Sequence, residues 1–486
     1  MDNSALNFPY SIIDDQADSN VLPSNSPMKF WVHHKGKSKD SNATSVSIFT
    51  STYLTDVNTM PDDAERCKAS LVPHFYKHCK NLVHPYLVRA IDVEEVEAAA
   101  QKSYLSKSAP PSNTCYIVTE PVEPLTLSKL KTLDLRDIIY GLHCVVQGLV
   151  FLHSNNLALG NFSLESVYVT RSGEWKIFDY SFITELSTPD SFNNRLPNDN
   201  FIYNYRAFSS LFSPDTLSNN AKYERVVGVH ALDAYNLSIF IGKIFNGHIP
   251  EKLIKANNRL RADKPKLRPR LPGLLKCPVF NDSYVKLNIF LNDFMLKTEE
   301  ERLDFVRNEL NFTEIPQDCA KFKILPIFED IVKGSERSLI IATVPKMFEI
   351  CELDGFNKND FQELNLFRIL MSLFDMVDRA IRANMLGRLN YIVSTEFLSS
   401  TQIGKIFDSV CTGFNDTNNS LREMTLKNMI HLLPVLEPSK IEKLLRYLIK
   451  LSSDEEDSIR VNTAIFIGKI CGKFRKHNFG NRCLCC

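Results

Sequence analysis

The residues of this chain that could take part in chemistry lie between Leu152 and Ser181. The pattern there predicts a helix end, a loop, a strand, a Ser-Gly turn and a second strand that leads to Asp179. The loop carries Asn161 and Ser166, so an amide, a hydroxyl and a carboxylate could meet there. A lone carboxylate rarely holds magnesium, because this ion binds through several oxygen ligands. We interpret Asp179 as a capped or solvated carboxylate, with residual metal or nucleotide binding as the alternative.

The layout of this stretch matches the catalytic loop and metal-binding turn of protein kinases, which read H-R-D-x-x-x-x-N and D-F-G. The corresponding residues here are Leu159, Gly160, Asn161 and Ser166, then Asp179-Tyr180-Ser181. The amide of Asn161 has no useful basicity where the kinase has its catalytic Asp, and Ser166 is a weaker metal ligand than Asn. The sequence therefore predicts a kinase-shaped domain that does not transfer phosphate.

The groups that hold the nucleotide phosphates in a kinase are also missing. Two expected strands, KFWVHH from Lys29 and SVSIF, flank the polar run GKSKDSNAT, where only Gly36 could serve in a glycine-rich loop. Phe49 stands at the position of the phosphate-binding Lys. In the helix expected over 62–81, Phe75 stands where a Glu would pair with that Lys, ten residues before Pro85. A benzyl group cannot pair with phosphate and would fill the space that a nucleotide needs.

The expected scaffold of the larger lobe is better kept than its chemistry. Apolar residues at helical spacing predict a long central helix over 134–153, and residues 91–113 read as an inserted surface loop. Asp233 opens the expected core helix. Asp215 and Arg268 stand where kinases have an acid and a late Arg that pair, so we expect a structural salt bridge between them.

The sharpest local excess of charge lies in residues 252–270. Against Asp263 as the one acid, this segment carries Lys252, Lys255, Arg259, Arg261, Lys264, Lys266, Arg268 and Arg270. A phosphate-bearing or acidic partner could bind there. The alternative is an ordinary solvated surface, which is favoured by the absence of interleaved aromatic residues for base stacking.

From about residue 315 the chain becomes a succession of expected helices with a repeated cue. An Asp-containing turn precedes Ile381-Arg382, Leu421-Arg422 and Ile459-Arg460, so the Arg positions advance by 40 and 38 residues. This period is typical of HEAT repeats, whose helical pairs stack into a solenoid with an extended groove. An irregular helical bundle is the alternative.

Composition places further limits on the chain. Lys and Arg number 57 and Asp and Glu number 57 in 486 residues, so no overall charge draws the chain to nucleic acid or membranes. The N-terminus has no signal-peptide pattern, and no apolar run approaches the length of a membrane span. The 12 Cys are mostly scattered, as expected for reduced thiols in a cytosolic protein. No metal site is predicted.

The fold class we predict is an α+β bilobal protein-kinase-like domain followed by an all-α HEAT-repeat solenoid. The expected boundaries are a flexible arm over 1–28, the pseudokinase domain over 29–272, a helical linker over 273–314, HEAT repeats over 315–471 and a basic, Cys-rich tail over 472–486. We interpret the tail as a truncated repeat. Its alternatives are a lipidated end or a zinc ligand set with His477.

These features together resemble the Scy-one-like, or N-terminal kinase-like, pseudokinases over nearly the whole chain. The shared marks include Gly36 to Lys39, Val118 to Glu120, Gly173 to Lys176, Ile249-Pro250, Ile324 to Pro326 and Gly468-Lys469. The resemblance implies a catalytically inactive scaffold without cofactor. Such proteins are linked to Golgi-to-ER retrograde traffic through the COPI coat and, in fungal-type relatives, to tRNA export at the nuclear pore.

Three hypotheses follow for the function. The first is a vesicle-traffic adaptor that binds coat or trafficking proteins through the HEAT groove, cytoplasmic or Golgi-associated, with peripheral membrane association as an option. The second is a tRNA-export adaptor that uses residues 252–270. The third is an unorthodox kinase that binds ATP through Asp179. Two departures from the family bear on them: the C-terminal tail that carries coat binding is missing, and Asp179 is retained.

Overall fold

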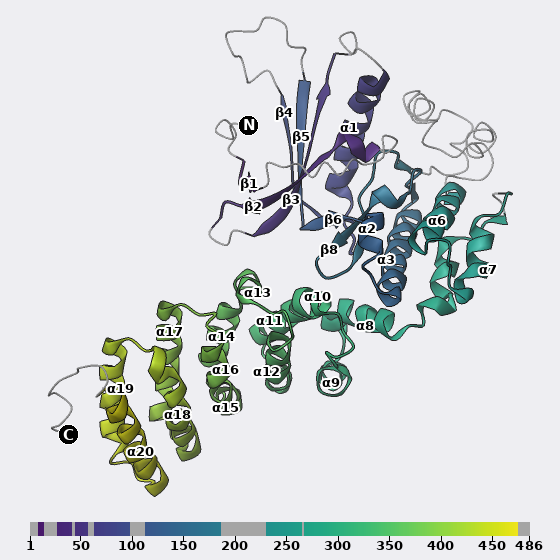
Figure 1. The fold of residues 1–486 in the computed structure, drawn as a ribbon. Helices are drawn as coiled ribbons and strands as arrows, with labels where there is room; N and C mark the ends of the chain where they lie inside the picture. Colours follow the sequence, from purple (N-terminus) through teal and green to yellow (C-terminus); the bar gives the residue numbers. More distant parts are fainter. Residues whose placement is uncertain are drawn as a thin grey trace, which may run out of the picture. The chain divides into compact units, whose positions relative to one another are not determined.

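The computed structural model describes residues 8–13, 27–40, 44–56, 63–97, 112–185, 230–264 and 267–474. Its contacts divide the chain into two compact units, Met1–Phe290 and Leu291–Cys486. The first unit combines β-sheet with helices and the second is helical, which confirms the predicted fold class (Figure 1). The division falls within the segment 273–314 that was predicted as a linker.

A five-stranded antiparallel sheet forms the first half of unit one. Its order is β1 (Tyr10–Ile12), β2 (Val32–Ser38), β3 (Ser45–Leu54), β5 (Ser112–Thr119) and β4 (Ala90–Glu97). The helix α1 (Asp63–Asn81) packs against β3, β4 and β5, as Figure 1 shows. Aromatic and β-branched residues make β3 and β5 suited to this half-buried surface.

Two expectations for this sheet need correction. The segment 91–113 is not one inserted loop, because Ala90–Glu97 forms β4 and Ser112 already belongs to β5. The residues 98–111 between them lie outside the described part of the chain. The polar run from Gly36 is not all turn either, since Gly36 lies inside β2 opposite Val46 of β3.

The second half of unit one is built around α3 (Leu135–Ser154). The other elements are β6 (Val122–Pro124), α2 (Leu127–Leu130), β7 (Leu157–Ala158), β8 (Val167–Thr170), β9 (Trp175–Ile177), β10 (Thr184–Glu185), α6 (His230–Ile244), α7 (Glu251–Leu260) and α8 (Ser283–Asn292). Strands β6, β8 and β9 form one antiparallel sheet, and β7 pairs with β10. This confirms the helix, loop and hairpin predicted for 152–181.

By length and composition alone, α3 could cross a membrane. This differs from the expectation that no apolar run approaches the length of a membrane span. Within the fold α3 is a core helix, because most of its apolar window is buried. Trp175 of β9 lies so close that a Cβ atom built on Gly141 would come within 2.1 Å of the indole ring. The helix therefore requires a glycine where it meets β9.

Unit two consists of helical pairs. The described helices are α9 (Glu299–Asp304), α10 (Gln317–Cys319), α11 (Leu325–Lys333), α12 (Arg337–Cys351), α13 (Lys358–Glu363), α14 (Leu366–Phe374), α15 (Arg379–Gly387), α16 (Leu389–Ser394), α17 (Ser400–Cys411), α18 (Asn419–Leu432), α19 (Pro438–Leu451) and α20 (Asp457–Phe474). The first helices of successive pairs, α11, α14, α17 and α19, pack on one another, and so do α12, α15, α18 and α20. Figure 1 shows these pairs side by side, as a HEAT-type solenoid requires.

The Arg positions of the repeat cue have a defined structural role. Arg382 lies 3.6 Å from Asp416 of the next pair. Arg422 donates two hydrogen bonds to Asp454 of the pair after that, at 2.8 and 2.9 Å, and a third to the Asp416 carbonyl. Arg422 therefore ties its own turn to the next repeat, and its guanidinium lowers the pKa of the Asp454 carboxyl below its ordinary value.

We expect Gly141→Ala to destabilise the fold by about 1–3 kcal/mol, because the added methyl must displace Trp175. Urea unfolding followed by tryptophan fluorescence measures this loss. The matched control is Gly242→Ala in α6, where a Cβ atom meets nothing within 4 Å. The control should leave stability equal or higher, because alanine is the better helix former. Equal stability losses in the two variants would contradict the packing described for α3.

We expect a double-mutant cycle on Arg422→Ala and Asp454→Ala to give a coupling free energy of about 1–3 kcal/mol in the unfolding of the chain. The lowered pKa of Asp454 means that this stability is present at neutral pH and is lost as pH falls through that pKa. The control pair is Glu329 and Lys333, an exposed bridge within α11. Its coupling should stay below about 0.5 kcal/mol.

Candidate functional site

Phe49, the predicted counterpart of the phosphate-binding Lys, lies in the interior of unit one. It sits on β3 between His33 of β2 and Ile117 of β5, and none of its surface is exposed. Its ring stacks on His33 at 4.7 Å and meets Phe178 at 4.7 Å and Tyr168 at 5.5 Å. The position of the phosphate-binding Lys is therefore a packing position.

Phe75 of α1 completes this packing from the other side. It is fully buried and contacts Phe178 at 5.1 Å, Tyr180 at 5.4 Å and Trp31 at 4.9 Å. Phe178 therefore touches both Phe49 and Phe75, the two residues that replace the ion pair of an active kinase. We call Trp31, Phe49, Phe75, Tyr168, Phe178 and Tyr180 the aromatic cluster. Rings in such tilted and edge-on contacts stabilise one another beyond their burial.

Asp179 and Ser166 are brought together as the sequence predicted, but inside the protein. Asp179 is only 2% exposed. Its carboxylate accepts hydrogen bonds from the Ser181 N–H at 3.1 Å and the Ser166 hydroxyl at 3.4 Å. Burial raises the pKa of Asp179 to about 6, and the bonds from Ser181 and Ser166 offset only part of this rise. The structure thus places Asp179 as a buried, capped carboxylate.

Asn161 is the remaining catalytic-loop position, and its backbone carbonyl accepts a hydrogen bond from Ser166 at 3.4 Å. In the described part of the chain, no three His, Cys, Asp or Glu side chains gather in a way that could hold a metal ion. Beside the Asp179 carboxylate the structure places the hydroxyls of Ser166 and Ser181.

Asp233 of α6 holds the loop in shape from within. It is fully buried and accepts hydrogen bonds from the N–H groups of Leu159 at 2.9 Å and Gly160 at 2.8 Å, while His153 Nε2 lies 2.9 Å away. Gly160 has a φ of 77°, which glycine adopts without strain. The loop therefore keeps a defined conformation without its catalytic residues.

Arg268 stacks on the Tyr235 ring at 4.7 Å and donates hydrogen bonds at 2.8 Å to the carbonyls of Ala231 and Ala262. It thus ties α6 to the segment after α7. Its predicted partner Asp215 lies outside the described residues, so that salt bridge stays a prediction.

The other predicted site residues lie on α7 and in the segment that follows it. Lys252, Lys255, Arg259, Arg261, Lys264 and Arg270 are all exposed, and Lys266 lies outside the described residues.

Sequence reasoning missed an ion pair at the hinge between the two sheets. Lys176 of β9 is buried and donates to both carboxylate oxygens of Glu120, at 2.7 and 2.8 Å. Glu120 also accepts from the Arg89 N–H at 3.0 Å. Both residues belong to short motifs of the family resemblance, but nothing in their spacing indicated that they pair.

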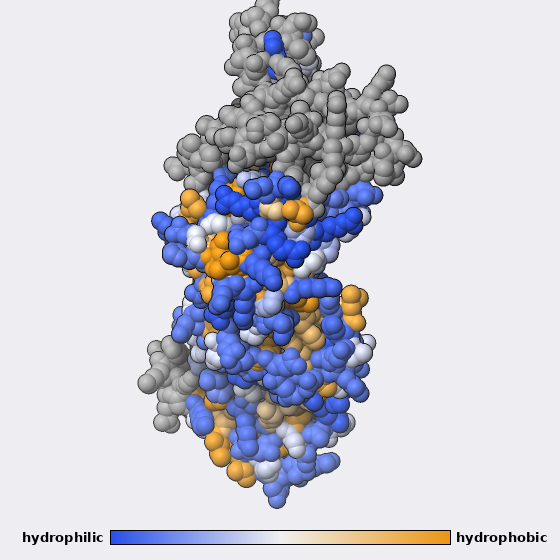
Figure 2. Space-filling model, turned by 90° about the vertical axis from the view of Figure 1, so that its right-hand side faces the viewer, coloured by the Kyte–Doolittle hydropathy of each residue, from blue (hydrophilic) through white to orange (hydrophobic). Residues whose placement is uncertain are grey.

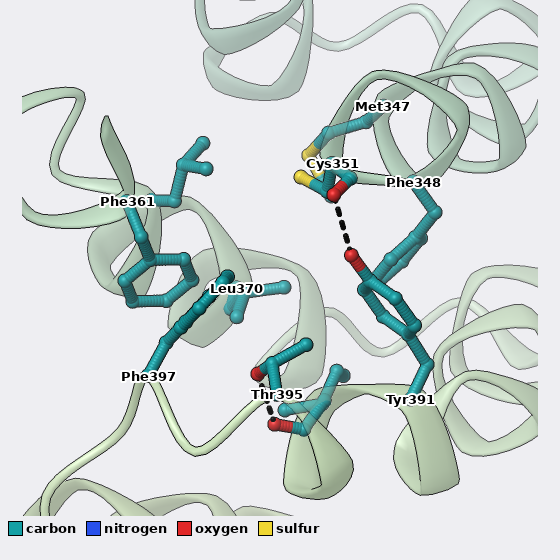
Figure 3. A pocket seen from close by; sticks show the side chains of 10 residues that line it. Met347, Phe348, Cys351, Phe361, Leu370, Tyr391, Thr395 and Phe397 are labelled. Atoms are coloured by element: carbon teal, nitrogen blue, oxygen red, sulfur yellow. Dashed lines mark hydrogen bonds between the residues drawn. The ribbon is translucent and has the colours of Figure 1, made fainter. Parts of the chain in front are cut away.

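Each of the two units contains a hollow. One of about 380 Å³ lies at the outer edge of the cleft and is lined by polar residues that include His33, Lys35, Glu123 and Lys129. The other lies inside the solenoid between aromatic and aliphatic side chains (Figure 3). Tyr391 donates a hydrogen bond to the Cys351 carbonyl beside it. At about 20 Å³ the second hollow has room for little more than a water molecule.

Comparison with known proteins places this geometry in a family. No family model matches the chain. It is 26% identical over 485 residues to the Dictyostelium discoideum protein named probable inactive serine/threonine-protein kinase scy1, which covers 96% of this chain and 54% of that protein. The chain therefore resembles the Scy-one-like pseudokinases, in agreement with the motifs of its sequence.

Two further relatives resemble this pseudokinase. The Mus musculus protein-associating with the carboxyl-terminal domain of ezrin is 24% identical over 385 residues, which is 75% of this chain and 49% of that protein. The Schizosaccharomyces pombe protein kinase domain-containing protein ppk3 is 24% identical over 480 residues, with 95% and 67% covered. The pseudokinase spans about half the length of the first two relatives.

A solved structure has the same fold. The crystal structure of Cex1p matches the pseudokinase with a TM-score of 0.60 and 19% identity, covering 97% of this chain and 82% of that chain.

We expect Asp179→Asn to stabilise the pseudokinase at neutral pH. Because the pKa of Asp179 is raised to about 6, ionising it costs folding free energy above that pH, on the order of 1–3 kcal/mol. The amide removes this cost, so its gain in denaturation midpoint should shrink as pH falls from about 7.5 to about 3, where the carboxyl is mostly protonated in both states. Asp263→Asn at an exposed position serves as the control. A gain that does not change with pH would contradict the buried carboxylate.

Proposed function

We propose that this pseudokinase is a catalytically inactive adaptor in intracellular vesicle traffic, working on the Golgi-to-ER retrograde route that is linked to the COPI coat. The aromatic cluster is the observation that supports catalytic inactivity. Phe49, Phe178 and Phe75 occupy the line along which an active kinase pairs Lys with Glu. Phosphoryl transfer depends on positioned charge, and this line contains only rings.

The adaptor role is supported by what the fold keeps. Asp233 holds the conformation of the loop at Leu159 and Gly160, although this loop lacks a catalytic base. The surface of the first unit is thereby kept in shape, and we propose that protein partners bind it. The solenoid of unit two adds an extended surface of the kind that repeat proteins use for partners. One relative is itself named for associating with the carboxyl-terminal domain of ezrin. Cytoplasmic and Golgi-associated location belongs to the same proposal.

A second candidate, a tRNA-export adaptor, is favoured by the exposed cations of residues 252–270. Nucleic acid affinity depends on such charges and falls steeply with salt. The two roles predict different partners. The 486-residue chain is fixed to a solid support and incubated with cytosol. It should retain COPI coat subunits if the vesicle-traffic proposal holds. It should retain tRNA and aminoacyl-tRNA synthetases if the alternative holds. Retention of tRNA alone, lost with salt, would replace the first proposal by the second.

Nucleotide binding gives a direct test of inactivity. We expect magnesium-ATP to leave the unfolding midpoint unchanged, whereas a ligand at 100 times its dissociation constant would stabilise the fold by about 2.7 kcal/mol. Phe49→Ala should cost about 3–5 kcal/mol in stability, because it opens a cavity in the aromatic cluster. The exposed Val83→Ala is its control. Magnesium-dependent autophosphorylation that Asp179→Ala abolishes would show instead that the protein is an active kinase.

A further inference from the structure

The helix α7 and the segment after it carry a charged surface that neither the fold nor the cleft uses. We call Lys252, Lys255, Arg259, Arg261, Lys264 and Arg270 the α7 basic surface. All six side chains are exposed, and no ion pair is found for them among the described residues. Between 251 and 276 the only acids are Glu251 and Asp263. In a chain whose formal net charge is zero, this concentration makes a local positive field.

The cations on α7 form a row. Leu253, Asn257 and Leu260 are buried on one face of the helix. Lys252, Lys255 and Arg259 follow at spacings of three and four residues, which places them along the solvent side over about 10 Å of the helix axis. Figure 2 looks onto the side of the molecule on which Figure 1 draws α7 and shows hydrophilic residues interrupted by small apolar patches.

The backbone beneath this row is held in place. The Leu253 N–H donates to the Pro250 carbonyl at 2.8 Å where the helix begins. The Cys277 thiol donates to the Lys252 carbonyl at 3.1 Å. Arg268, through the Ala262 and Ala231 carbonyls, fixes the segment that follows. The cations are therefore presented by a rigid scaffold, so a partner that meets them need not order the backbone.

Two apolar side chains accompany the cations at the surface. Ile254 is 44% exposed on α7 and Leu267 is 63% exposed after it. No Phe, Tyr or Trp occurs between residues 251 and 276, so the surface has no ring on which a nucleic acid base could stack. Cations with aliphatic side chains among them suit the interface of an anionic bilayer, where the charges meet headgroups and the aliphatic groups enter the acyl boundary.

We propose that the α7 basic surface is a contact for membranes that contain anionic phospholipids. This gives the proposed vesicle-traffic adaptor a membrane contact of its own. It does not depend on which coat protein the solenoid binds, because every residue involved lies in unit one.

Sedimentation of the full-length chain with vesicles tests the proposal. The chain should bind vesicles of phosphatidylcholine with phosphatidylserine, and vesicles of phosphatidylcholine alone only weakly. A triple variant, Lys252→Gln, Lys255→Gln and Arg259→Gln, should bind the anionic vesicles about 100-fold more weakly, since each cation near such a surface contributes about fivefold. Raising the salt concentration should weaken the wild type as well.

The matched control neutralises three other exposed lysines of unit one, Lys77, Lys80 and Lys131, for the same change in net charge. It should bind vesicles like the wild type. The double variant Ile254→Ser and Leu267→Ser should lose several-fold in vesicle binding without any change in tRNA mobility shift. Unchanged thermal unfolding shows that each variant is folded.

Two outcomes would overturn the proposal. One is equal vesicle binding by the wild type and the triple variant. The other is a triple variant that loses tRNA binding but keeps vesicle binding, which would assign the surface to nucleic acid. In either case the retention of coat subunits by the same immobilised protein is measured separately. The vesicle-traffic adaptor can therefore survive the failure of this membrane contact.

Discussion

The contact of Phe178 with both Phe49 and Phe75 is the interaction on which the first unit depends. It joins β3, α1 and the end of the β8–β9 hairpin through buried rings. In an active kinase the strand and the helix among these elements are joined by a Lys–Glu ion pair. Rings need no such pair, since dispersion and burial act between uncharged groups. The buried rings thereby join the three elements directly.

The buried carboxylates of this unit, Asp233 and Asp179, also depend on contacts within the protein. Asp233 is stable inside the fold because backbone N–H groups and His153 surround its carboxylate. Asp179 is buried as well, and this burial raises its pKa despite the hydrogen bonds from Ser181 and Ser166. One carboxylate holds a loop in shape and the other is an electrostatic cost. The retained Asp of the metal-binding turn is consistent with a remnant of catalysis rather than a working group.

In the solenoid the equivalent organising element is a chain of charges. Arg382 and Arg422 each reach the Asp of the following pair, so adjacent repeats share an ion pair as well as an apolar interface. The Arg422–Asp454 pair is mostly buried and bidentate, which strengthens it. In repeat proteins each pair contacts only its neighbours, and stability is therefore set by these local interfaces.

The sequence by itself determined the fold class, the central helix over 134–153 and the repeat, because these depend on periods of apolar residues that a single chain displays. It also predicted that Phe49 and Phe75 stand at two kinase positions, from motif spacing alone. Only the tertiary structure decided what the replacements do. Trp31, Tyr168 and Phe178 come from distant segments of the chain, and their meeting with Phe49 and Phe75 depends on how these segments pack. The Lys176–Glu120 pair, the strand within the supposed insertion and the burial of Asp179 were hidden for the same reason: each results from contacts between segments far apart in the chain, which leave no periodic trace in the sequence.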